Sequence, residues 1–261
     1  MRQICIILSL LALTINSIAQ TITLGGAGNS IQVGVEGLIL HLPLSAEYRQ
    51  SDLIFSDVAP NAYHGTAALS PVFTIDPWGY ENGAFYVGSS ADQNAHITTF
   101  PVIDYCAQAD YTITFWIRVN PNPPDWKQFL VYGNTANTYI HFRIENNDKI
   151  IYQYRSGGTF SHFYSPEPID DGVWHFIVFE HYWGGSRTTR LMTIYEDNQY
   201  SGYFTYSADE YVDGNDLYIG SSGSTCTGVY MCEFKIFNHV LTAEERTREF
   251  NNRPRLITIG E

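Results

Sequence analysis

The feature that most constrains the fold of this chain is a series of short apolar runs separated by turn residues. The runs are rich in β-branched and aromatic residues, which suit a pleated, half-buried surface. They are Gly37–Leu44, Tyr111–Val119, Ile140–Ile144, Lys149–Arg155, Val173–Tyr182, Leu191–Tyr195, Leu217–Gly220 and Tyr230–Phe237. Many short strands with turns between them predict an all-β sandwich or jelly roll built from two antiparallel sheets.

The segment Tyr111–Val119 shows the alternation most clearly. Its odd-numbered residues, from Tyr111 to Val119, are all apolar and share one face, whereas Thr112, Thr114, Trp116 and Arg118 share the other. One segment near the end of the chain is instead typical of a helix. Thr242 followed three residues later by Glu245 forms a capping-box pattern, which predicts one short helix to Phe250.

The first 19 residues have the pattern of a secretory leader. Arg2 supplies a positive start, residues 4–13 are apolar, and residues 17–19 form a small-x-small cleavage site, so we expect the mature chain to begin near Gln20. The apolar run is shorter than the roughly 20 residues that a membrane-spanning helix needs. The leader predicts a protein that is secreted, periplasmic or at the cell surface. A Gly-rich lead-in at 20–36 and a tail at 251–261 flank the predicted sandwich.

The charge balance excludes two classes of partner. The chain has 14 basic and 27 acidic residues, and a formal net charge of −13. A chain this acidic repels nucleic acid and anionic lipid. The partners we expect are therefore glycans or surface proteins, with no nucleic acid and no membrane insertion.

Three cysteines remain after the leader: Cys106, Cys226 and Cys232. Because export permits disulfides, and three is an odd number, at most one internal bridge forms. Cys226 and Cys232 are the nearest pair, and Gly228 between them can supply a turn, so we predict this bridge. The alternative is that Cys106 pairs with one of the other two.

The order of the motifs resembles that of a known family. Residues 37–44 are similar to an opening strand, residues 57–65 to the loop that follows it, and Tyr111–Ile117 to a Phe-Thr-Ile-Ser-Phe-Trp strand. Residues 171–178 resemble an Asp-Gly-x-Trp-His-x-Val signature, and residues 233–245 resemble a final strand with its short helix. Together these motifs resemble the laminin G-like domains of the concanavalin A-like lectin/glucanase superfamily. The resemblance implies a jelly-roll sandwich over residues 37–250 and a buried Trp174.

The same resemblance implies a calcium site at the rim of the sandwich. Its ligands would be Asp57, with Asn61 nearby, and an acid in the last strand. The family often has Asp-Glu-Val in that strand, where this chain has Cys232-Glu233-Phe234. The alternative is that Asp57 and Asn61 bond only to their own turn.

Catalysis is not supported by the acidic residues. Glucanases of this fold carry Glu-x-Asp-x-Glu on one strand, and this chain has no such pattern. We therefore expect a protein that is not an enzyme, with a glycoside hydrolase as the least favoured class.

Aromatic residues at strand ends are the predicted ligand-binding groups. Aromatic residues make up 15% of the chain. Tyr182 and Trp183 stand before two glycines, which leave the ring faces uncovered, and Tyr154 and Tyr164 flank another Gly-containing turn. These residues favour a lectin-like module that binds glycans or surface ligands. The competing hypothesis is a structural or protein-interaction sandwich in an extracellular assembly.

Overall fold

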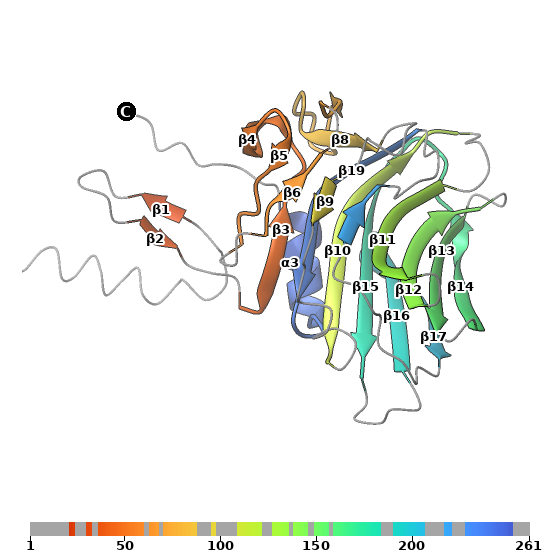
Figure 1. Ribbon diagram of the computed structural model, residues 1–261. Helices are drawn as coiled ribbons and strands as arrows, with labels where there is room; N and C mark the ends of the chain where they lie inside the picture. Colours follow the sequence, from red (N-terminus) through yellow and green to blue (C-terminus); the bar gives the residue numbers. More distant parts are fainter. Residues whose placement is uncertain are drawn as a thin grey trace, which may run out of the picture.

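Figure 1 shows a computed structural model of the 261-residue chain. The structure describes residues 21–23, 30–32, 36–59, 63–67, 70–87, 95–97, 109–121, 127–135, 138–145, 149–156, 159–183, 190–206, 217–220 and 228–252. The predicted leader and three residues with predicted roles, Asn61, Cys106 and Cys226, lie outside the described residues.

Two antiparallel sheets form the domain. The eight-stranded sheet has the order β17-β16-β15-β10-β19-β8-β7, and β3 also pairs with β19. Its strands are β3 (Leu38–Leu42), β7 (Phe73–Thr74), β8 (Ala84–Val87), β10 (Tyr111–Val119), β15 (Trp174–Tyr182), β16 (Arg190–Glu196), β17 (Gln199–Tyr206) and β19 (Val229–Phe237).

The nine-stranded sheet has the order β14-β13-β12-β11-β18-β9-β6-β5-β4. Its strands are β4 (Arg49–Ser51), β5 (Ile54–Phe55), β6 (Gly65–Thr66), β9 (Ala95–Ile97), β11 (Lys127–Thr135), β12 (Thr138–Ile144), β13 (Lys149–Ser156), β14 (Thr159–Pro168) and β18 (Leu217–Ile219). A 3-10 turn (Ala46–Tyr48) precedes β4, and the lead-in contains a separate ribbon of β1 (Thr21–Thr23) and β2 (Ser30–Gln32). The predicted all-β, two-sheet jelly-roll sandwich is confirmed.

Aromatic side chains join the two sheets across the core. Phe179 of β15 packs edge-on against Phe142 of β12, with ring centroids 4.4 Å apart. Phe115 of β10 meets Phe129 of β11 at 5.8 Å. All four rings are fully buried, and each contributes about 1.5–3 kcal/mol relative to exposure. The apolar face predicted for Tyr111–Val119 lies in this core, as expected.

The opposite face of β10 is buried as well, which the alternation of residue types did not indicate. Helix α3 (Ala243–Asn251) packs on the outer face of the eight-stranded sheet beside β10 (Figure 1). Phe250 of this helix stacks on Trp116 with ring centroids 5.6 Å apart. Trp174 is half-buried in the same outer cluster, with Arg118 over its ring, and is less buried than the core position implied by the resemblance.

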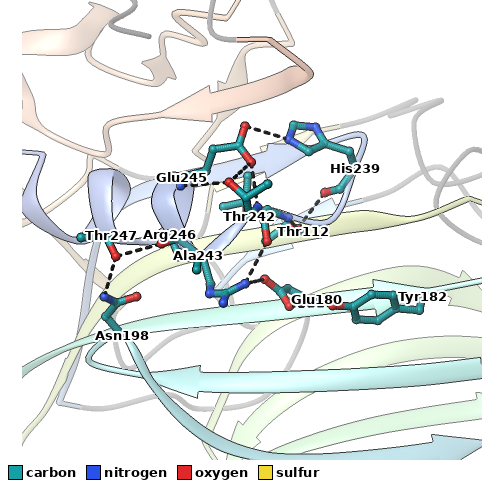
Figure 2. Close-up of polar contacts among 11 residues, drawn as sticks. Thr112, Glu180, Tyr182, Asn198, His239, Thr242, Ala243, Glu245, Arg246 and Thr247 are labelled. Carbon is teal, nitrogen blue, oxygen red and sulfur yellow. Dashed lines mark hydrogen bonds and ion pairs between the residues drawn. The ribbon is translucent and has the colours of Figure 1, made fainter. Parts of the chain in front are cut away.

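The helix is fixed to the sheet by its first turn. The capping box is present as predicted: the Glu245 amide donates to the Thr242 hydroxyl, and the Thr242 amide donates to the Glu245 carboxylate. Upstream of the cap, the Thr112 hydroxyl of β10 donates to the His239 carbonyl and accepts from the Leu241 amide. Figure 2 shows these contacts around the start of the helix. Of the helices in the described part of the chain, none is long and apolar enough to cross a membrane.

Strands β14 and β17, the end strands of the two sheets, pack against each other at one side of the sandwich. Phe163 of β14 stacks on Phe204 of β17, with ring centroids 5.4 Å apart and an angle of 9° between the rings. Gly202 makes room for this contact, since a Cβ atom at that position would lie 2.8 Å from the Cζ atom of Phe163. A residue without a side chain therefore lets the two sheets approach each other here.

Candidate functional site: a tyrosine patch beside helix α3

Four tyrosines gather on the outer face of the eight-stranded sheet, on strands β15, β16 and β17. We call Tyr182, Tyr195, Tyr200 and Tyr203 the tyrosine patch. Tyr195 pairs with Tyr200 across the β16–β17 hairpin, and Thr193 stands between Glu180 and Tyr203. Since paired residues in adjacent strands lie on the same face, these side chains share the outer face with helix α3.

A bulge places two of these tyrosines on one face. Tyr200 and Tyr203 are three residues apart, so regular alternation would put them on opposite faces. The register of β17 shifts next to Ile194 and Tyr195, and Ser201 is left without a partner in β16. Because of this extra residue, the side chain of Tyr203 lies on the same face of the sheet as that of Tyr200. The two side chains are the most exposed large apolar groups of the described chain, at 59% and 61%.

A buried ion pair lies below the patch. Nη1 of Arg246, from helix α3, lies 2.5 Å from Oε1 of Glu180, whose side chain is completely buried. The Tyr182 hydroxyl donates to the other oxygen of Glu180 at 3.1 Å. The Arg246 guanidinium lies over the Tyr195 ring, 3.9 Å from its centroid. Figure 2 shows Arg246 reaching from the helix to Glu180, which in turn contacts Tyr182.

This arrangement favours the protonated form of two patch hydroxyls, those of Tyr182 and Tyr195. Burial and the nearby Glu180 carboxylate raise the pKa of Tyr182 to about 12. The same two causes raise the pKa of Tyr195. The pKa of Glu180 itself is also raised, because burial outweighs the opposing effect of Arg246. At neutral pH Tyr182 and Tyr195 therefore carry protonated phenols.

The hairpin that carries Tyr195 and Tyr200 is held at its turn. Asp197 and Asn198 both adopt positive φ, at 50° and 62°, as a tight hairpin turn with right-handed strand twist requires. The side-chain nitrogen of Asn198, Nδ2, donates to the Thr247 hydroxyl of helix α3 at 3.0 Å (Figure 2). The patch thus sits on a short hairpin that is tied directly to the helix.

The structure separates the ligand-binding residues predicted from the sequence. Tyr182 lies in the patch. Trp183, half-buried, follows β15, and its amide donates to Asp110 at 2.8 Å. Tyr164 lies on the other sheet, where it is 38% exposed and its hydroxyl donates to Glu145 at 3.4 Å. Tyr154 pairs with Ile140 and Ser161 in β13, and its side chain lies outside the described residues.

Asp57 accepts hydrogen bonds on both of its carboxylate oxygens, from its own loop and from β3. Its Oδ1 accepts hydrogen bonds from the amides of His41 and Ala59, and its Oδ2 accepts from the amide of Tyr63. Its predicted companion Asn61 lies outside the described residues. No group of three or more potential metal-ligating His, Cys, Asp or Glu residues occurs among the residues that the structure describes. The calcium site stays a prediction.

Cys232 is a free thiol, and its predicted partner Cys226 lies outside the described residues, so the bridge between them stays a prediction. Cys232 is buried beneath helix α3 in the outer cluster with Trp116 and Phe176. Because it points into this packed layer, burial raises the pKa of its thiol well above the usual value. Residue spacing alone could not reveal that β19 turns this cysteine toward the helix.

A family comparison fits this architecture. The model of the concanavalin A-like lectin/glucanases superfamily matches residues 88–245, which is more than half of the chain. The chain belongs to this superfamily. The superfamily's fold accounts for the two sheets, and the predicted resemblance is confirmed. A search of curated proteins found no match.

Solved structures share the fold at low sequence identity. The binding domain of Paraclostridial Mosquitocidal Protein 1 is 13% identical with a TM-score of 0.65. The receptor binding domain of botulinum neurotoxin D is 15% identical with a TM-score of 0.63. In both comparisons 82% of this chain aligns with 52% of the other. The chain thus spans about half the length of these domains.

Five residues of the site were not among the predicted site residues: Glu180, Tyr195, Tyr200, Tyr203 and Arg246. The sequence does carry one signal for the tyrosines, since an Asp-Asn turn is preceded by Tyr195 and followed by Tyr200 and Tyr203. Such a hairpin indicates ring pairs across two strands. The sequence gives no comparable indication for Arg246, because its contact with Tyr195 and Glu180 depends on where helix α3 docks.

Proposed function

We propose that this protein is a secreted, non-enzymatic, lectin-like module that binds glycans through the tyrosine patch. The observation that carries the proposal is the pair of exposed rings, Tyr200 and Tyr203, on a hairpin anchored to helix α3. Exposed rings on an anchored hairpin are ready to bind, because an aromatic side chain has few torsions to fix.

The chemistry of the patch suits sugars. A pyranose has one face of C–H groups, which can pack on a ring, and hydroxyls around its edge, which need hydrogen-bond partners. Tyrosine offers both an apolar ring and a hydroxyl. Because Tyr182 stays protonated at neutral pH and donates its proton to Glu180, its hydroxyl oxygen is left to accept a hydrogen bond from a sugar hydroxyl.

The acid closest to the patch is poorly suited to hydrolysis. Glycosidases need two carboxylates beside the scissile bond. Glu180 has no exposed side-chain surface and is held by Arg246 and Tyr182. A sugar on the patch would therefore contact rings above a buried ion pair, which favours binding without catalysis.

Two further observations support export and surface recognition. The leader-like residues 1–19 support secretion or display at the cell surface. The solved structures with the same fold are described as binding or receptor-binding domains. The ligands of those domains are not assigned to this chain. The domains illustrate that a sandwich of this shape can serve recognition.

A second candidate function is a protein-interaction module, and the same exposed tyrosines favour it. Tyrosine is enriched among the residues that dominate protein interfaces. The two candidates differ in the ligand, so one experiment with defined ligands can separate them.

The test is a broad glycan array probed with the wild-type protein and with Tyr200→Ala and Tyr203→Ala. A matched control is Tyr80→Ala, since Tyr80 is also exposed, at 40%, but lies in the turn before β8. We expect wild type and control to bind the same glycans, and each patch variant to bind about fivefold or more weakly. All variants should keep the wild-type melting temperature. If the wild type binds no glycan, with calcium or with chelator, the protein-interaction candidate replaces this proposal.

A further inference from the structure

Helix α3 touches the tyrosine patch from one side without forming its exposed surface. Its contact is made by Arg246, whose side chain is 13% exposed. From this placement we propose that Arg246 is a positioning residue, which fixes the tyrosine patch in its binding geometry without contacting the ligand. The inference rests on the proposed function and adds a role for the helix.

Arg246 is held at several points. Its Nη1 donates to Oε1 of Glu180 at 2.5 Å and to the carbonyl of Leu241 at 2.8 Å. Both bonds come from one nitrogen of a planar group, so they restrict the tilt of the guanidinium. The Cζ atom of the guanidinium lies over the Tyr195 ring, 3.9 Å from its centroid. A cation this close to a ring attracts it and fixes its orientation.

The orientation passes from Tyr195 to an exposed ring. Tyr195 and Tyr200 meet edge to face, with centroids 5.9 Å apart and an angle of 75° between the rings. Such pairs have a preferred geometry. Arg246, Tyr195 and Tyr200 therefore contact one another in turn from the helix to the surface. Tyr200 is the exposed member of this series, and a ligand can contact it.

The ion pair acts on a second tyrosine. Glu180 accepts the Tyr182 hydroxyl on Oε2 while Arg246 occupies Oε1. A Glu180 without its arginine would be a buried, unpaired acid, and such a group becomes protonated or moves. The positions of Tyr182 and Tyr195 thus both depend on a residue that comes from the last helix of the described chain.

The experiment compares three variants with the wild type. Glu180→Gln combined with Arg246→Met removes both charges together, which avoids leaving one buried charge unpaired. Arg246→Lys keeps the charge but lacks the planar group. Arg248→Met is the matched control on the same helix, because Arg248 lies 3.8 Å from Glu249 and that ion pair does not involve the patch. Affinity is measured by calorimetry with the glycan that the array identifies, and folding by circular dichroism and melting temperature.

A second readout reports on the patch without any ligand. The ionisation of Tyr182 is followed by NMR of ring-labelled tyrosine, with Tyr182→Phe to assign the signal. We expect the double variant to lower the pKa of Tyr182 below about 12, because the Glu180 charge that raises it is gone. We expect its affinity for the glycan to fall about three- to tenfold. Arg246→Lys should recover part of that affinity, and Arg248→Met should change neither quantity.

Two results would overturn the inference. A folded double variant with wild-type affinity would show that Arg246 does not position the binding surface. A Tyr182 pKa of about 12 in the double variant would show that the ion pair does not hold that tyrosine, whether or not a glycan binds. A third pair of results is possible: the wild type binds no glycan, and the Tyr182 pKa is lowered in the double variant. This pair would overturn the proposed function, and with it the expected effect on affinity.

Discussion

The stability of this domain should depend on a histidine held between two aspartates. His175, at the start of β15, places its Nδ1 2.9 Å from Asp197 in the β16–β17 turn. Its Nε2 lies 3.2 Å from Asp171, in the loop before β15. The hydrogen bond with Asp197, opposed by burial and aided by Asp171, raises the pKa of His175 to about 9. The protonated imidazole thus joins two segments that are distant in sequence.

The direction of the pH effect follows from this raised pKa. Unfolding returns the pKa of His175 from about 9 to its ordinary 6.5. The stabilisation is therefore fully present below pH 6.5 and is lost as the pH rises through about 9. A pKa difference of about 2.5 corresponds to at most about 3.4 kcal/mol. Because the side chains of Asp171 and Asp197 are 55% and 42% exposed, solvent screening reduces this to about 1–2 kcal/mol.

The assay is urea denaturation at about pH 6 and about pH 10, which bracket both pKa values, for the wild type and for His175→Gln. Other groups titrate in this range, and the variant cancels their contribution. The wild type should lose about 1–2 kcal/mol more than the variant between the two conditions. Equal losses would refute the reasoning, as would an NMR titration that places the pKa of His175 at or below its ordinary value.

Three further substitutions test the packing. Gly202→Ala should destabilise the domain by about 1–3 kcal/mol, because the added Cβ would clash with Phe163. Adding Phe163→Leu should restore part of this stability, as measured by urea denaturation. If the losses of the two single variants simply add in the double variant, the clash is not the cause. Thr242→Ala should cost about 1 kcal/mol through the lost cap of helix α3, measured as a lower melting temperature; an unchanged value would show that the capping box contributes little. Lys235→Met should cost about 3–5 kcal/mol, because it removes the 2.8 Å partner of the buried Glu249 and leaves that carboxylate with Arg248 at 3.8 Å. Combining it with Glu249→Leu should restore most of the stability, and no recovery would argue that packing around Lys235 causes the loss.

The fold could be predicted from the sequence because the local residue patterns match the residues that form the core. The strand predicted at Tyr111–Val119 has the same bounds in the structure, and the helix predicted from the Thr242 cap begins at the next residue. Strands β11, β14 and β17 were not singled out. The last of these contains a glycine and a bulge, and such features interrupt the alternation that identifies a strand.

The site was only partly predictable, for reasons that lie in tertiary structure. Tyr182 was named from its place at a strand end, and it does lie in the patch. Tyr203 reaches the same face only through the extra residue Ser201, and a register shift cannot be read from residue types alone. The burial of Cys232 in the outer cluster depends on where helix α3 docks, which the spacing of cysteines does not indicate.

The strand order also has a consequence for how the protein is made. Strand β19 lies in the middle of its sheet, where it pairs with β10, β8 and β3. Residues 229–237 leave the ribosome after all of those partners, so the sheet stays open along its centre until they emerge. Pairings between such distant segments are slow to form. During synthesis the edges of β10 and β3 are therefore exposed to neighbouring chains, and we expect the nascent protein to depend on chaperones until β19 has been made.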